Sequence, residues 1–160
     1  SAVQRIAREE NLDDDEHLIL NTAALFHDSG YIFTYHHNEE LGIKMARKIL
    51  PDYGYTPNQI HIISGIIRTT KVRSKPKTHI QMIMNDADYD YLGRKDYFKV
   101  AATLYKELLG QGLKITRNDW IKMQIRFLER HTYYTEYSKK NRHRQKLANM
   151  AKLIRSLSEV

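Results

Sequence analysis

Residues 18–28 read LILNTAALFHD, a helical pattern that ends in a His-Asp pair. Its apolar side chains recur at spacings of three and four residues and so share one helix face; they are Leu20, Ala23 and Ala24. His27 continues that face, so we predict that its ring points inward, with Asp28 beside it at the helix end. Gly30 is expected to stop the helix.

The rest of the chain is predicted to form further helices. Seven glycines and three prolines are few for 160 residues, which favours helices over turn-rich β structure. The predicted segments cover residues 1–9, 13–28, 39–50, 57–70, 79–92, 96–109, 118–131 and 136–157. Because no repeat or interdomain linker interrupts them, we predict one all-α domain over residues 1–160, a bundle of about seven or eight helices.

Local signals place several helix starts. Thr56 followed by Pro57 has the order of an N-cap and a first helical residue. Either Thr116 or Asn118 is expected to cap the seventh helix. No cap is assigned to the segment 1–9, so its helix is expected to begin before Ser1.

Composition limits the kinds of partner and site. The chain has a 41% hydrophobic content, sufficient for a core, and no cysteine, which excludes disulfides and thiolate metal sites. No apolar run reaches the roughly 18 residues of a membrane span, so a cytoplasmic protein without membrane contact is expected. The net charge of +7 allows anionic partners.

A second inward acidic group lies on the segment 79–92. The apolar stripe of that segment consists of Ile80, Ile83, Met84, Ala87 and Tyr91. Asp88 falls within this stripe, whereas Asp86 and Asp90 share the other side, where Asp90 is expected to be largely solvated. An inward carboxylate is costly unless a cation or several donors meet it. Asp88 is therefore either a hydrogen-bonded core residue or, with His27 and Asp28, part of a divalent-metal site.

Two motifs resemble a known family. Residues 25–31, LFHDSGY, and residues 86–94, DADYDYLGR, resemble the HD-domain superfamily of metal-dependent phosphohydrolases. The resemblance extends over nearly the whole chain. It includes residues 120–131, WIKMQIRFLERH, which look like a subgroup of small stand-alone HD proteins. It implies that the predicted domain over residues 1–160 is an HD-type helical bundle.

The resemblance also implies a metal site. It assigns His27, Asp28 and Asp88 as catalytic metal ligands around a divalent ion, which could be Mn, Mg, Fe, Co, Ni or Zn. The family's first histidine lies on the preceding helix, which the resemblance places before Ser1, so the N-terminal helix of the domain is expected to be truncated. With one ligand fewer, His27 is expected to hydrogen-bond a neighbouring carboxylate.

A single metal is favoured over two. Asn38 and the pair Thr69-Thr70 occupy positions where two-metal relatives carry further ligands. His36 and His37 follow the His-Asp pair, either as such ligands or as solvated residues at the mouth of the cleft. Of the two, His37 is kept as a candidate substrate-binding residue.

Phosphate binding would need cations. A basic loop after the fourth helix supplies Arg68, Lys71, Arg73, Lys75 and Lys77, either as a phosphate-binding cluster or as a solvated surface. We predict Lys71 and Arg94 as the phosphate contacts. Glu39 and Glu40 are candidate acids or bases.

The leading hypothesis is a metal-dependent phosphohydrolase acting on a phosphomonoester or phosphodiester, with a small nucleotide-like substrate. The alternative is a non-catalytic or regulatory nucleotide-binding HD module. The basic run 139–146, KKNRHRQK, is expected to be a solvated helix face and not a nucleic-acid site, since no nucleic-acid motif accompanies it. Gln124 and His131 are expected to serve an internal hydrogen-bond network.

Overall fold

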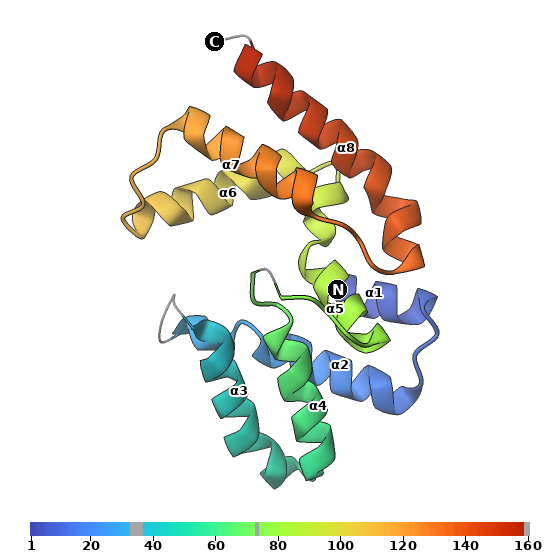
Figure 1. The fold of residues 1–160 in the computed structure, drawn as a ribbon. Coiled ribbons are helices and arrows are strands. Elements are labelled where there is room, and N and C mark those ends of the chain that lie inside the picture. Colours follow the sequence, from blue (N-terminus) through green and yellow to red (C-terminus); the bar gives the residue numbers. More distant parts are fainter. Residues whose placement is uncertain (33–36, 73, 159–160) are drawn as a thin grey trace. The chain divides into compact units, whose positions relative to one another are not determined.

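The computed structural model describes residues 1–32, 37–72 and 74–158, and this part of the chain is helical without strands (Figure 1). The α-helices are α1 (Ala2–Glu9), α2 (Asp14–Phe26), α3 (Asn38–Ile49), α4 (Pro57–Arg68), α5 (His79–Asp88), α6 (Tyr97–Gly110), α7 (Arg117–Arg130) and α8 (Glu136–Ser158). Three 3₁₀ turns join them: η1 (Ser29–Ile32), η2 (Leu50–Tyr53) and η3 (Asp90–Gly93). The all-α prediction is confirmed. None of the described helices is both long and apolar enough to cross a membrane.

Most helix ends follow the predicted signals. Thr56 caps α4 through the backbone NH of Gln59, and Thr116, not Asn118, caps α7. Three ends differ from the prediction. The helix predicted over residues 13–28 ends at Phe26, and Gly30, expected to stop it, lies in the 3₁₀ turn η1. Ser1 caps α1 in a capping box, so the expected lack of a cap is wrong. The predicted segment 79–92 divides into α5, which ends at Asp88, and the 3₁₀ turn η3.

The chain divides into two compact units, residues 1–88 and 89–160. In the first unit α5 packs against α1, α2 and α4, while α3 packs against α4. The core includes Ile6, Leu20, Ile63, Ile66, Ile67, Ile83 and Met84, all almost fully buried. Because three helices surround α5, Asn85 and Asp86 are buried together with Ile83, Met84 and Ala87 of the predicted apolar stripe. The single HD-type domain over residues 1–160 stays a prediction.

The second unit has its own core. It contains Leu92, Tyr97, Ala101, Ile121, Leu128 and Leu153, from η3 and helices α6, α7 and α8. The Tyr97 hydroxyl donates a hydrogen bond of 2.7 Å to Oε1 of Gln124, which confirms the internal role predicted for Gln124. Lys146, within the predicted solvated run 139–146, is instead buried, and its Nζ donates to the carbonyls of Leu128 and His131.

His131 lies in an aromatic environment instead of the predicted hydrogen-bond network. The rings of Tyr89, Phe127 and Tyr133 surround it. Both of its ring nitrogens are buried without a hydrogen-bond partner among the described residues, so that expectation is wrong. Burial, and after it the charge of Lys146, lowers the pKa of His131 to about 4.

This lowered pKa predicts acid sensitivity. The unfolded chain binds a proton on His131 below a pH of about 6.5, whereas the folded chain does so only near pH 4. The free energy of unfolding should therefore fall as pH drops through this window, by up to about 1.4 kcal/mol per pH unit. His131→Phe should flatten the dependence in urea unfolding measured from pH 7 to pH 4. His143→Gln, at an exposed histidine of the same unit, should leave it unchanged; equal slopes in wild type and His131→Phe would contradict the prediction.

Candidate metal centre

His27 ends the inward face of α2. Leu20 and Ala23 on that face are completely buried, and the His27 side chain is 17% exposed. Its Nδ1 lies 2.7 Å from the carbonyl oxygen of Ala24. Because a carbonyl only accepts hydrogen bonds, Nδ1 carries the hydrogen and donates, which leaves Nε2 for another partner. The sequence did not predict this contact, because a carbonyl lies three residues before every position of a helix.

The turn after His27 is held close to the start of α3. Ser29 Oγ donates 2.7 Å to the carbonyl of Phe26. A Cβ atom on Gly30 would lie only 1.9 Å from the carbonyl oxygen of Asn38, so only glycine allows this approach. The close approach at Gly30 therefore lets η1 pack against α3. Gly30 does not stop α2, which already ends at Phe26.

The structure brings the three predicted ligands of the first unit together. Nε2 of His27 lies 3.1 Å from Oδ2 of Asp28 and 3.7 Å from Oδ1 of Asp88, the last residue of α5. The Asp28 side chain is 63% exposed and that of Asp88 is 28% exposed. The expected contact of His27 with a neighbouring carboxylate is thus present. One nitrogen faces two carboxylates that come from different helix ends.

These carboxylates change the acidity of the imidazole. Burial by itself would lower the pKa of His27, but hydrogen bonds to Asp28 and Asp88 and their negative charges raise it to about 10. A positive charge at Nε2 is therefore strongly favoured. Without a metal ion, this charge comes from a proton on Nε2, and a metal ion would have to displace that proton.

The donor set has the chemistry of a divalent-metal site. An imidazole and two carboxylates suit first-row divalent ions and Mg²⁺, and a carbonyl on the second imidazole nitrogen is the usual support for a metal-binding histidine. Among the described residues, no group of three or more His, Cys, Asp or Glu side chains is placed so that it could hold a metal ion. Asp28 and Asp88 each lie near Nε2 of His27, at 3.1 Å and 3.7 Å.

The other two aspartates of the motif are buried. Asp86 is fully buried within α5. Asp90 is 1% exposed, and Nε of Arg142 lies 2.7 Å from its Oδ1. The expectation that Asp90 is largely solvated is wrong, because α5 ends at Asp88 and the helical periodicity does not continue into η3.

The predicted substrate-binding residues lie in both units. In the first unit Nζ of Lys71 lies 2.9 Å from Oε1 of Glu40, and Nδ1 of the exposed His37 lies 4.0 Å from Oε2 of the same residue. The hydrogen bond from Lys71 lowers the pKa of Glu40. Arg94 belongs to the second unit, where it pairs with Asp96. His36 and Arg73 lie outside the described residues.

Thr69 and Thr70 have local roles. Their hydroxyls donate to the carbonyls of Ile66 and Ile67 at the end of α4. Asn85 Nδ2 donates 3.2 Å to the carbonyl of Thr69 and so joins α5 to this end. The preference for a single metal stays a prediction.

Comparison with known proteins gives one family. A family model described as HD domain matches residues 2–91, more than half of the chain. The match includes His27, Asp28 and Asp88 and almost all of the first unit. No curated protein and no solved structure matches the chain.

Proposed function

Since the chain belongs to the HD domain family, we propose that it is a metal-dependent phosphohydrolase acting on a phosphomonoester or phosphodiester, with a small nucleotide-like substrate. The observation that carries this proposal is Nε2 of His27 facing Asp28 and Asp88 while Nδ1 is held by a backbone carbonyl. A nitrogen that lies near two carboxylates supports the proposal of a cation site, for which the side chains would have to move closer together.

In the proposed site His27, Asp28 and Asp88 hold a divalent ion. A bound ion of this kind polarises a phosphoryl oxygen and lowers the pKa of a coordinated water. Ala24 fixes the ring orientation and keeps the hydrogen on Nδ1, so that Nε2 can give up its proton and coordinate. The exposed Asp28 would form the solvent side of the site, where a substrate enters.

Substrate binding at the metal centre is proposed for Lys71 and His37 of the first unit, while a substrate contact of Arg94, in the second unit, stays a prediction. The pair between Lys71 and Glu40 joins two half-exposed side chains, and such pairs contribute little to stability. Lys71 can therefore exchange Glu40 for a phosphate oxygen at small cost. The exposed His37 ring, which lies near Glu40 as well, would then contact the same phosphate.

Lys71→Ala is expected to raise KM for p-nitrophenyl phosphate about tenfold while kcat falls less than threefold, because a ground-state phosphate contact is lost. Lys75→Ala is the matched control, since Lys75 is an exposed lysine of the same loop. Steady-state kinetics of both variants measure the effect. Equal KM values for Lys71→Ala and Lys75→Ala would contradict a role for Lys71.

The proposed function is tested by turnover. The metal-free chain is titrated with Mn²⁺, Co²⁺, Ni²⁺, Zn²⁺ and Mg²⁺ and assayed with p-nitrophenyl and bis-p-nitrophenyl phosphate. Metal-dependent release of nitrophenol that chelator abolishes supports the enzyme. Tight binding of a nucleotide without turnover of either ester would favour the regulatory module instead.

A further inference from the structure

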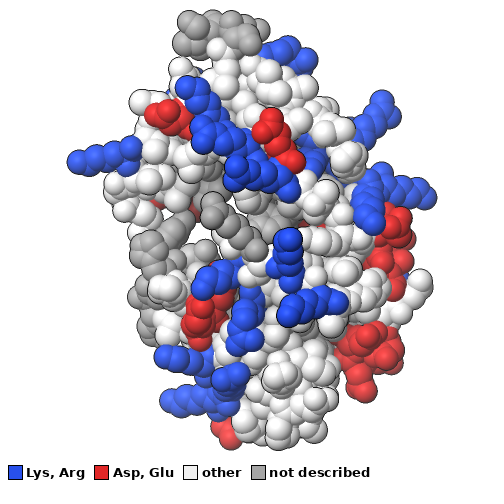
Figure 2. Space-filling model, in the orientation of Figure 1, with Lys and Arg blue, Asp and Glu red and all other residues white. Residues whose placement is uncertain are grey.

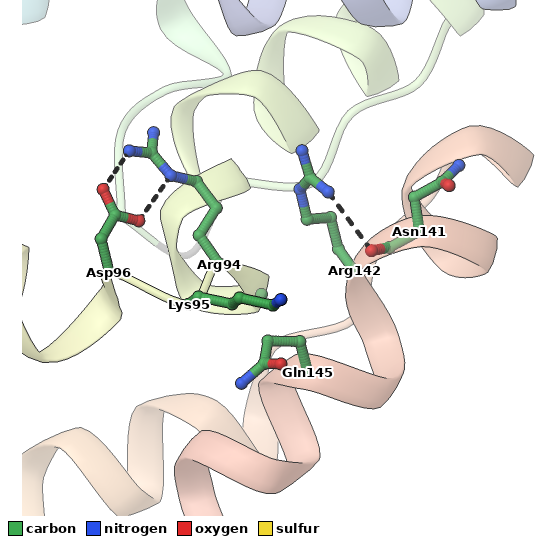
Figure 3. A pocket seen from close by; sticks show the side chains of 7 residues that line it. Arg94, Lys95, Asp96, Asn141, Arg142 and Gln145 are labelled. Atoms are coloured by element: carbon green, nitrogen blue, oxygen red, sulfur yellow. Dashed lines mark hydrogen bonds and ion pairs between the residues drawn. The ribbon is translucent and has the colours of Figure 1, made fainter.

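The second unit contains a pocket of about 410 Å³ beside α8 (Figure 3). One wall is the connection from η3 to α6 and the other is the N-terminal half of α8. The side chains that line it are Arg94, Lys95, Asp96, Asn141, Arg142 and Gln145. The volume is in the range of small-molecule sites.

Three contacts fix the two walls to each other. A Cβ atom on Gly93 would lie 2.4 Å from the carbonyl oxygen of Arg142, so glycine is required for this approach. The buried Asn149 donates from Nδ2 to the carbonyls of Leu92 and Arg94, both at 2.9 Å. Arg142 on α8 pairs with the buried Asp90 of η3. The pocket is therefore part of the packed structure of this unit.

The lining is positively charged. The lining has three cationic side chains and the carboxylate of Asp96, which pairs with Arg94, while Arg142 pairs with the buried Asp90. Lys95 is exposed and has no ion pair among the residues that the structure describes, and in Figure 3 its side chain extends along the pocket toward α8. Figure 2 shows Lys and Arg side chains on several parts of the visible surface, so charge alone does not single out this place. The combination of a cavity with a lysine that has no ion pair and an arginine in an exposed pair does.

The carboxylate of Asp96 already binds the guanidinium of Arg94 in the way that a phosphate would. Nε and Nη2 of Arg94 donate to the two oxygens of the Asp96 carboxylate, the paired geometry in which guanidinium also binds phosphate. Both side chains are nearly half exposed, so this pair contributes little to stability and can be exchanged. The carboxylate would then compete with an incoming phosphate for the same donors.

We propose that this pocket binds the phosphate group of a small phosphomonoester, with Lys95 and Arg94 as its main contacts. The amide of Gln145 lies on the opposite wall, where the organic part of the ligand would rest. All the lining residues belong to the second unit, and none of them is a predicted metal ligand.

The test is a titration of the full ¹⁵N-labelled chain with 5′-AMP, inorganic phosphate and adenosine, followed by amide NMR shifts in the presence of EDTA. AMP and inorganic phosphate should shift the amides of residues 93–96 and 141–145, and adenosine should not. Lys95→Glu should weaken AMP binding about tenfold or more, and Asp96→Asn should strengthen it about threefold to tenfold, because a competing charge is removed.

Two control variants distinguish binding in this pocket from general attraction to a basic surface and from binding at the metal centre. Lys106→Glu makes the same charge change at an exposed lysine of α6 outside the pocket, and it should change the AMP affinity less than twofold. Asp88→Ala alters the metal centre and should leave the titration unchanged. Equal losses in Lys95→Glu and Lys106→Glu, shifts outside the pocket only, no phosphate-dependent shifts, weaker binding in Asp96→Asn, or loss of binding in Asp88→Ala would each overturn the proposal.

Discussion

Asp88→Ala is expected to lower the affinity for divalent metal about 100-fold or more and to abolish phosphohydrolase activity. The substitution removes one of the two carboxylates that face Nε2 of His27. It should also lower the pKa of His27 from its value of about 10, because one of the two negative charges that raise it is gone. NMR titration of the His27 ring gives this second readout without any metal.

The matched control is Asp52→Ala, at an exposed aspartate of the same unit. Asp90→Ala is unsuitable as a control, because Asp90 is buried and paired with Arg142. Calorimetric titration with Mn²⁺ compares the variants. Equal metal affinity in Asp88→Ala and Asp52→Ala, or an unchanged His27 pKa, would contradict the assignment of Asp88.

Arg142→Met is expected to lower the free energy of unfolding by about 3 kcal/mol, because it leaves the Asp90 carboxylate buried without its arginine. The Asp90 side chain is 2% exposed and that of Arg142 is 18% exposed, so water cannot fully replace the guanidinium. Urea unfolding, with Arg144→Met as the control at an exposed arginine of α8, measures the difference.

A double-mutant cycle makes this prediction specific. If Arg142 acts through Asp90, adding Asp90→Asn to Arg142→Met should restore part of the lost stability, since the uncompensated charge is then gone. A loss in Arg142→Met no larger than in Arg144→Met would contradict the role of the pair.

Local sequence signals were sufficient for the helices and for the inward direction of His27. Thr56 and Pro57 mark the start of α4, and the spacing from Leu20 to His27 places the ring on the buried face of α2. The same argument placed Asp88 inward and Asp86 and Asp90 on the other side, whereas both of these are more deeply buried than Asp88, which does lie near His27. The helix start and the direction of the His27 ring depend on residues within one or two helical turns, so the sequence pattern carries them directly.

Features that depend on distant partners could not be predicted in this way. Asp90 was assigned to solvent because the helix was expected to continue, and its partner Arg142 lies on α8. The basic run 139–146 looks like a solvated face, yet Arg142 and Lys146 have buried partners on other elements. The hydrophobic periodicity of one segment does not indicate where on another element such a partner lies.

We propose that His27, Asp28 and Asp88 hold one divalent metal ion. A crystal structure of the Mn²⁺-loaded chain, with an anomalous difference map at the manganese edge, measures this directly. We expect one peak bonded to Nε2 of His27 and to an oxygen of each carboxylate, at about 2.0–2.3 Å. A manganese peak elsewhere, or a loaded crystal in which Nε2 of His27 still contacts Asp28 without metal, would contradict it.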